Sequence, residues 1–251
     1  MGDTRKLSRL QQTWDRLGEK NPFWAALTSS DEWDQETFFE TGRKEVSDLM
    51  DYIHTLPVTL GSGRALDFGC GAGRLSQALS AYFDEVHGVD IAPSMIQVAE
   101  QFNRHNEKCR YHLNPDNDLR LFPDDHFDFI YSNLVLQHIA PDYTFKYLKE
   151  FLRILAPSGL LIFQLPSRLI SNNRLLQALF DILPASFWLG MAALRDAYRQ
   201  KPAMEMHGIE RDKVIAFFTG NGGEVLDVQL DKRPTTEHSI WEHYMYTVTK
   251  G

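Results

Sequence analysis

The stretch Leu66-Asp67-Phe68-Gly69-Cys70-Gly71-Ala72-Gly73-Arg74 decides the fold of this chain. A short apolar run precedes it, a helical pattern follows it, and the acidic residue Asp90 ends the next apolar run. This order predicts a strand, a glycine turn and a helix N-terminus, then a second strand that ends in a carboxylate. Gly69 and Gly71 let the backbone turn sharply and approach a ligand without a Cβ atom, and Gly73 lets the helix pack close to the strand. A carboxylate about 20 residues after such a turn is placed to accept hydrogen bonds from ribose hydroxyls, so the stretch predicts a site for a nucleoside-containing ligand.

The spacing of the glycines distinguishes between two kinds of nucleoside ligand. The pattern here is Gly-x-Gly-x-Gly, whereas the dinucleotide fingerprint is Gly-x-Gly-x-x-Gly, which sets a pyrophosphate on the helix N-terminus. Asp67 also stands just ahead of the first glycine. Its carboxylate opposes a pyrophosphate but suits a cofactor that carries a positive sulfonium and an ammonium group.

Four elements in this order resemble the class I S-adenosylmethionine-dependent methyltransferases. Leu66 to Gly73 is similar to the first motif of that family, Asp90 to its ribose-binding acid, and Ile91-Ala92-Pro93-Ser94-Met95 to the turn that follows. Phe127 to Asn133, with the loop that reaches His138-Ile139, resembles the fourth strand and its loop. The resemblance covers residues 60–166 well and residues 207–250 more loosely. It implies an enzyme that transfers a methyl group.

The resemblance implies S-adenosylmethionine as the cofactor and places it at the carboxyl ends of the strands. The residues assigned to it lie in the glycine turn and at the ends of the second, third and fourth strands: Asp67, Gly69, Gly71, Gly73, Arg74, Asp90, Ile91, Asn114, Asp116, Asp118, Leu119, Ser132 and Asn133. Asp90 either accepts from the ribose or caps the next helix. Arg74 either fixes the turn or the cofactor carboxylate, or is simply solvated at the first helical turn.

The residue that binds the adenine stays open. The family uses a side chain after the third strand, often acidic, together with neighbouring backbone amides. Here Asn114-Pro115-Asp116-Asn117-Asp118-Leu119 departs from the usual Gly-Asp pair. Asn114, Asp116 and Asp118 therefore all compete for this role, and an ordinary polar turn is the alternative for each.

Two histidines are the candidates for catalysis. His138 follows the fourth strand, and His207 lies near the presumed mouth of the substrate site, with Glu205 and Tyr244 as further polar candidates there. A base is needed only if the acceptor must lose its proton during the attack, and histidine suits that task because its unperturbed pKa is about 6.5. A structural, hydrogen-bonding histidine is an equal alternative for His138.

Strands and helices alternate along the chain. Apolar runs predict strands at 85–90, 110–114, 127–133 and 160–165, and helical patterns predict helices from 93 to about 105 and from 143 to 155. A helix at 211–219 and two final strands, 225–230 and 241–249, complete the pattern. This alternation predicts the α/β class with a doubly wound, mostly parallel sheet. The resemblance implies seven strands with an antiparallel pair at the end.

An N-terminal helical arm is predicted at residues 1–60, ahead of a methyltransferase domain at 61–251. Its Leu49, Met50, Ile53 and Leu56 repeat at helical spacing and end at Pro57. The aromatic residues of the arm either anchor it onto the core or, through Phe38 or Phe39 with Thr41-Gly42, cover the cofactor cleft.

A helical insertion is predicted at about 167–208, after the fifth strand. Its apolar part is interrupted by Gln177, Asp181 and Pro184, which argues against a membrane-spanning helix and for two short helices. The insertion lies where open α/β sheets bind ligands, so a lid or a substrate pocket is one interpretation. A homodimer contact through its apolar face is the other.

Composition narrows the partners. A length of 251 residues, 43% of them hydrophobic, suffices for one full α/β core. The net charge of −8 disfavours nucleic acid, which is bound mainly through Lys and Arg. Cys70 and Cys109 are too few for a disulfide framework or a Cys-rich zinc site, so we expect reduced core thiols and no metal. The absence of an apolar run near the N-terminus predicts a cytoplasmic protein.

Two other functions compete with methyl transfer to a small-molecule acceptor. A nicotinamide-dependent oxidoreductase would need the x-x-Gly spacing and usually a Tyr-x-x-x-Lys set, whereas the chain offers only Tyr-x-x-Lys at Tyr143 to Lys146. A catalytically inactive, methyltransferase-like partner protein would not need the turn and both acids. Among acceptors, metabolites, lipids and sugar moieties remain, with oxygen or nitrogen as the expected atom.

Overall fold

The computed structural model describes residues 3–30, 32–171, 174–183, 187–188, 190–191, 204–231 and 241–251. In these residues one sheet is formed in the order β3-β2-β1-β4-β5-β7-β6, in which β7 runs antiparallel to both of its neighbours. The strands are β1 (Arg64–Phe68), β2 (Glu85–Asp90), β3 (Cys109–Leu113), β4 (Phe127–Ser132), β5 (Leu155–Leu169), β6 (Gly223–Leu230) and β7 (Trp241–Lys250). The predicted seven-stranded, doubly wound sheet is confirmed.

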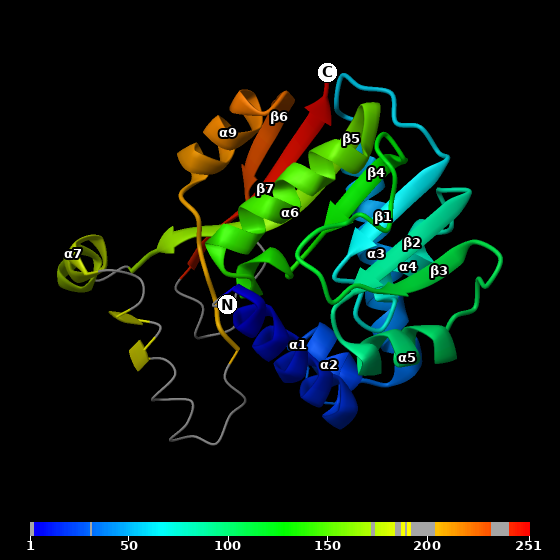
Figure 1. Ribbon diagram of the computed structural model, residues 1–251, viewed down its shortest axis with the longest axis horizontal. Helices are drawn as coiled ribbons and strands as arrows, with labels where there is room; N and C mark the ends of the chain where they lie inside the picture. The colour runs from blue at the N-terminus through cyan, green and yellow to red at the C-terminus, as the bar shows by residue number, and fades with distance from the viewer. Residues whose placement is uncertain are drawn as a thin grey trace.

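Helices lie on both faces of the sheet (Figure 1). They are α1 (Asp3–Lys20), α2 (Pro22–Ala26), α3 (Gln35–Ile53), α4 (Arg74–Leu79), α5 (Pro93–Gln101), α6 (Pro141–Ile154), α7 (Arg174–Ile182) and α9 (Arg211–Gly220), with a 3-10 turn at Leu136–His138. Figure 1 shows α6 and α9 in front of the sheet, α3 and α4 behind it, and α1 and α2 below the ends of the central strands. The helices predicted for the N-terminal arm are therefore present.

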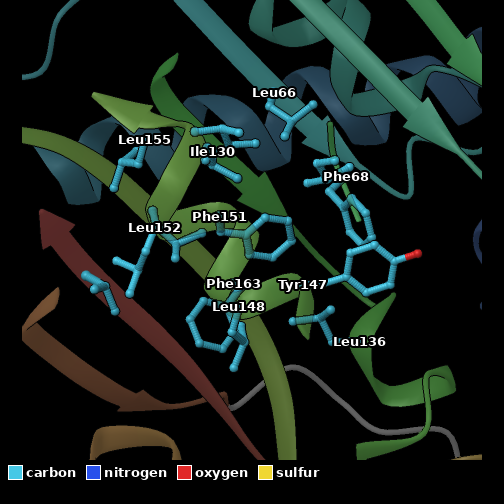
Figure 2. Close-up of a cluster of buried hydrophobic side chains, with 14 of the residues drawn as sticks. Leu66, Phe68, Ile130, Leu136, Tyr147, Leu148, Phe151, Leu152, Leu155 and Phe163 are labelled. Atoms are coloured by element: carbon cyan, nitrogen blue, oxygen red, sulfur yellow. The ribbon is translucent and has the colours of Figure 1, made fainter. Parts of the chain in front are cut away.

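The alternation of side chains along the strands divides the core into two layers. Leu66, Phe68 and Ile130 point to the face of α6 and α9, where they pack with Phe151 and Phe163 (Figure 2). Their neighbours along the strands point the other way: the cluster on the face of α3 and α4 contains Ala65, Phe129, Tyr131, Val46 and Leu79. Strands buried on both faces need continuous apolar runs, which is the pattern that the sequence has.

The helix that begins at Pro93 is shorter than predicted. It ends at Gln101 rather than near His105. Asn103 explains this, because its side-chain oxygen accepts the amide of His105 and its side-chain nitrogen donates to the carbonyl of Cys109. Such local hydrogen bonds offer the backbone an alternative to the helix.

The boundary between α6 and β5 also differs from the prediction. The helix ends at Ile154, and the strand begins at Leu155, which pairs with Phe127, instead of beginning at 160. Pro157-Ser158-Gly159 is an irregularity inside the strand rather than the end of the helix, since the pairing register shifts there and Ser158 has a φ of 60°.

The segment after β5 leaves the sheet at residue 169, so 167–169 belong to the strand and not to the insertion. α7 lies apart from the body of the molecule at the left of Figure 1. The predicted break at Pro184 lies outside the described residues. None of the described helices is long and apolar enough to cross a membrane.

Candidate functional site

A cleft opens at the carboxyl ends of β1, β2 and β4 and holds about 930 Å³ of atom-free space, part of it open to solvent. The glycine turn and the strand ends form its floor. Leu10 and Trp14 of α1, with Ala25 and Ala26 of α2, form its roof. The glycine motif predicted the floor of this site, and residues of the N-terminal arm complete it.

All three glycines of the turn have positive φ angles, 79° at Gly69, 52° at Gly71 and 81° at Gly73. This region of backbone conformation disfavours residues with a Cβ atom. At Gly69 a Cβ would also lie 2.2 Å from a methyl carbon of Val135, and at Gly73 it would lie 2.4 Å from the hydroxyl of Tyr111. The expected tight turn and close helix packing are both present.

The amides of this turn are already bonded within the protein. The carbonyl of Val89 accepts from the amides of Gly69 (2.7 Å) and Cys70 (3.0 Å), and the amide of Gly73 donates to the carbonyl of Cys70 (2.9 Å). The amide of Gly71 donates to the Asp90 carboxylate at 2.9 Å. These four groups are unavailable to a pyrophosphate, which binds through free backbone amides.

Asp90 stands at the end of β2 and lines the cleft. One of its oxygens accepts from the amide of Gly71, and the other accepts from the amide of Ala92 at 2.8 Å. Burial raises the pKa of this carboxyl above its usual range, and the two amides oppose that rise. The carboxyl thus holds the turn and the start of α5 in place, and its remaining lone pairs face the cleft.

Asp67 does not reach the cleft surface. It is buried with 1% exposure and accepts a hydrogen bond from the hydroxyl of Ser76 at 2.6 Å. Burial raises its pKa to about 7, while Ser76 and the charge of Arg74 act in the other direction. Asp67 therefore lies behind the turn, where it bonds to Ser76 at the start of α4 and makes no direct contact with the cleft.

Arg74 is a buried residue, so the interpretation of a solvated side chain is wrong. Its guanidinium forms an ion pair with Glu45 of α3 at 2.8 Å and donates to the hydroxyl of Thr41 at 3.3 Å. Glu45 also accepts from the hydroxyl of Tyr131 at 3.0 Å and from the side-chain amide of Asn133. Since Arg74 and Asn133 both line the cleft, Glu45 links the arm to the site.

Sequence reasoning missed Glu45, although a signal exists. It stands between Gly42 and Leu49 on the face of α3 that contacts the core, three residues after the first and four before the second. A carboxylate on the apolar stripe of an amphipathic helix is unusual unless it has a partner.

Phe38 and Phe39 do not cover the cleft. They are buried in a separate cluster with Ala72, where Phe38 stacks on Phe23 at 4.5 Å between ring centroids. The interpretation that aromatic residues anchor the arm is the correct one. Trp14 and Leu10 cover the cleft instead.

In the candidate adenine region only Asn114 lines the cleft. Its side-chain nitrogen donates to the carbonyl of Asp118 at 2.8 Å, so it closes the turn. Asp116 accepts through its carbonyl from the hydroxyl of Tyr147 at 2.6 Å, and the side chain of Leu119 is fully buried. Of the three candidates for binding the adenine, Asn114 is therefore the one that the geometry favours.

Ile91 and Asn133 line the cleft, but Ser132 does not. The hydroxyl of Ser132 donates to the carbonyl of Phe68 at 3.1 Å and so fastens β4 to β1. The carbonyl of Ile91 accepts from the side chain of Gln11 at 3.0 Å, which fixes α1 above the cleft.

A second cavity adjoins the cleft and shares Leu10, Trp14 and His138 with it. Its atom-free space is about 1150 Å³, part of it open to solvent. Its other walls are formed by α1, by the start of α6 and by residues 204–207, with the side chains of Lys6, Leu7, Arg9, Thr13, Ala140, Tyr143, Met204, Glu205 and His207. Both predicted catalytic histidines and Glu205 lie here, whereas Tyr244 lies in β7 and lines neither cavity.

His138 is a neutral histidine with both ring nitrogens engaged. Its Nδ1 lies 2.8 Å from the carbonyl of Glu205, and since a carbonyl only accepts, Nδ1 carries the proton. Its Nε2 then accepts from the side-chain nitrogen of Gln137 at 3.0 Å. Burial lowers the pKa of His138 to about 4.

His207 is half-buried. Its Nε2 lies 3.6 Å from the carboxylate of Glu205, and burial lowers its pKa as well. His207 lines the second cavity but not the cleft.

Comparison with known proteins gives the same family as the motifs. A family model described as a methyltransferase domain matches residues 66–163. Malonyl-[acyl-carrier protein] O-methyltransferase of Halorhodospira halophila is 34% identical over 129 residues, which cover 48% of this chain and 40% of that relative. The match spans about two fifths of the length of the first curated relatives.

Solved structures show the same fold. A SAM-dependent methyltransferase of Leishmania major has a TM-score of 0.66 at 14% identity, over 97% of this chain and 82% of that chain. Magnesium protoporphyrin IX methyltransferase of Synechocystis, solved with bound SAH, has a TM-score of 0.63 at 14% identity, over 98% and 99% of the two chains. The predicted methyltransferase domain is matched at residues 66–163, and the predicted fold is confirmed.

Proposed function

We propose that this chain, which carries a class I S-adenosylmethionine-dependent methyltransferase domain, moves a methyl group from that cofactor to a small-molecule acceptor. The observation that carries the proposal is the glycine turn itself. The amides of Gly69, Cys70 and Gly73 are bonded to backbone carbonyls, and that of Gly71 is bonded to Asp90, whose carboxyl group lines the cleft. Such a floor repels a pyrophosphate and suits a cationic ligand with ribose hydroxyls.

The residues around the cleft fit this cofactor. Asp90 is positioned to accept from the ribose, Asn114 lies where the adenine is expected, and Asn133 lies where the methionine part is expected. When bound, S-adenosylmethionine supplies a methyl carbon that its sulfonium has already activated. The roles of Asp116, Asp118, Leu119 and Ser132 remain predictions.

The protein's own contribution is positioning and the exclusion of water. Leu10 and Trp14 separate the cleft from the second cavity, so an acceptor in that cavity approaches the cofactor across an apolar boundary. Holding two reacting atoms about 3 Å apart in the right geometry contributes roughly 7–11 kcal/mol. His138 stands at the same boundary, where its hydrogen bonds to Gln137 and to the carbonyl of Glu205 hold its ring in place.

The net charge of the chain and its similarity to a named relative both narrow the class of acceptor. The net charge of −8 argues against a nucleic acid. The relative from Halorhodospira halophila is named an O-methyltransferase, which supports oxygen as the accepting atom. A metabolite, a lipid or a sugar moiety remains in accord with the apolar roof.

The proposal also assigns a role to each part of the chain. Residues 1–60 act as an arm that roofs the domain at 61–251, and the insertion predicted at about 167–208, which begins only after β5 ends at Leu169, acts as a lid or substrate pocket. The cytoplasmic location and the homodimer contact stay predictions from the sequence.

Two alternatives predict different binding. A nicotinamide-dependent oxidoreductase would bind a dinucleotide, for which the turn offers occupied amides. An inactive partner protein would bind the cofactor but release no methylated product from any acceptor. Binding and turnover therefore separate all three functions.

Calorimetric titration with S-adenosylhomocysteine tests the proposal. We expect the wild-type protein to bind it, and Asp90→Ala and Gly71→Val to lose most of the affinity. A Cβ at Gly71 would lie 3.3 Å from Ala26 and Met95, so the second variant also narrows the turn. Asp84→Ala is the matched control, because it removes an exposed carboxylate just before β2, at the end of that strand opposite to Asp90. Unchanged binding in both site variants, or binding of a nicotinamide dinucleotide instead, would refute the assignment.

A further inference from the structure

We propose that the acceptor is a carboxylic acid, bound as its carboxylate in the second cavity and methylated on a carboxylate oxygen. This inference rests on the proposed function and narrows it to one class of substrate. It depends on the position of the cavity, on the charges around it and on the absence of a suitable base among the described residues that border both cavities.

The position of the second cavity makes it the acceptor site. It meets the cofactor cleft only across Leu10, Trp14 and His138, which line both. The ring of Trp14 packs edge-on against the ring of His138 at 4.9 Å between centroids, so these two side chains form one wall. Because Leu10, Trp14 and His138 line both cavities, a molecule in the second cavity lies next to the cofactor cleft.

The charges around the cavity favour an anion. Lys6 and Arg9 of α1 line it and are exposed. In the part of the chain that the structure describes, no carboxylate lies within ion-pair distance of either of them. Among the described lining residues Glu205 supplies one carboxylate, which lies 3.6 Å from Nε2 of His207. The described lining thus carries two cations and one carboxylate, and this excess of positive charge on a chain with a net charge of −8 favours an anionic group in the cavity.

The shared wall offers no effective base for a neutral acceptor. Leu10 and Trp14 cannot take a proton, and His138 holds its proton on Nδ1 and its lone pair toward Gln137. Burial lowers the pKa of His138 to about 4, which is far below that of any hydroxyl acceptor. Tyr143 and His207 line only the second cavity. Burial lowers the pKa of His207 as well, so neither histidine of the cavity is an effective base for a hydroxyl acceptor.

A carboxylate acceptor is an anion, as the charges around the cavity favour, and it needs no base to remove a proton. Its attacking oxygen forms the new bond to the methyl carbon while the carbon–sulfur bond breaks, and the electron pair of that bond stays on sulfur. The products are a methyl ester and a neutral thioether, and no proton has to be removed. An amine can attack without a base only in its free-base form. Its dominant ammonium form is repelled by Lys6 and Arg9. The carboxylate is therefore the acceptor that the cavity fits.

Matched probes test this inference. Three carbon skeletons, phenylpropane, decane and cyclohexane, each carrying a terminal carboxylate, alcohol or amine, are titrated by calorimetry into protein saturated with S-adenosylhomocysteine. We expect at least one acid to bind at least tenfold more tightly than its alcohol and its amine, and its affinity to fall as salt is raised. Mass spectrometry with S-adenosylmethionine should then show its methyl ester, with a rate that is flat from about pH 6 to 9.

The double variant Lys6→Gln/Arg9→Gln should weaken acid binding at least tenfold and leave S-adenosylhomocysteine binding unchanged. The double variant Arg104→Gln/Lys213→Gln removes two exposed cations that line neither cavity and should change neither. The inference is wrong if no acid binds, if an alcohol or amine binds equally well, or if Lys6→Gln/Arg9→Gln keeps the acid affinity. If S-adenosylhomocysteine itself fails to bind, the proposed function fails instead.

Discussion

The floor and the roof of the cleft are built in different ways. The floor consists mainly of the glycine turn and the ends of β1, β2 and β4, and each of these segments is specified by a short local sequence pattern. The roof comes from α1 and α2, which reach the site only through tertiary packing, as when Gln11 donates to the carbonyl of Ile91 and the carboxylate of Asp15 accepts the amide of Ser94. Local sequence patterns therefore specify where the cofactor binds. The packing of the arm specifies which side chains cover it.

The largest effect is expected in the floor, from Gly69→Ala. A left-handed conformation costs a residue with a Cβ atom about 1–2 kcal/mol, and overpacking costs about 1–3 kcal/mol more, because the Cβ would meet Val135. The free energy of unfolding, measured by denaturant titration, should fall by about 2–5 kcal/mol. Gly220→Ala is the control, since a Cβ there meets nothing within 4 Å. Equal stability of the two variants would contradict the account of the turn.

A smaller effect is expected where the arm meets the floor, from Glu45→Gln. This change leaves the Arg74 guanidinium, of which 6% is exposed, without its carboxylate. Removing one partner of a buried ion pair costs several kcal/mol, and because Glu45 is partly exposed we expect about 2–3 kcal/mol. Lys44→Gln breaks the exposed pair with Asp48 on the same helix and should cost about 0–1 kcal/mol. If Glu45→Gln cost no more than Lys44→Gln, Glu45 would not link the arm to the floor.

The smallest effect is expected in the roof, from Gln11→Ala. It removes one partly buried hydrogen bond to Ile91, which corresponds to about 0.5–1.5 kcal/mol. Hydrogen exchange should show faster opening of α1 with no change at the central strands. Gln12→Ala, one residue along the exposed face of the same helix, is the matched control. Equal exchange in the two variants would show that the side chain of Gln11 does not fasten the roof.

The sequence predicted the floor well because its signals are local. The glycines, the acid at the end of β2 and the apolar strands each follow from the conformation that a short stretch must adopt. Helix ends were less accurate, since Asn103 ends α5 through bonds to residues that a helical pattern does not reveal. The fifth strand was underestimated because an irregular Pro-Ser-Gly segment resembles a helix end.

The roof and the network around Glu45 were not predicted because they depend on contacts between distant residues. Trp14 and Leu10 fall on a polar helix whose pattern does not show what it covers. The aromatic cluster of Phe38 and Phe39 drew attention to the wrong part of the arm, since rings favour the core as readily as a ligand. Of the predicted catalytic residues, His138 stands at the boundary of the two cavities and His207 stands farther out.

The carbonyl of Val89 accepts two amides of the turn, and Asp90 accepts a third, so this cradle is already rigid before any molecule arrives. Ordering a loop on association usually consumes part of the interaction free energy. Little free energy is lost in this way here, because the turn is already ordered. A fragment as small as adenosine should therefore retain a large share of the affinity per atom of the full cofactor, which makes this floor a favourable starting point for inhibitors.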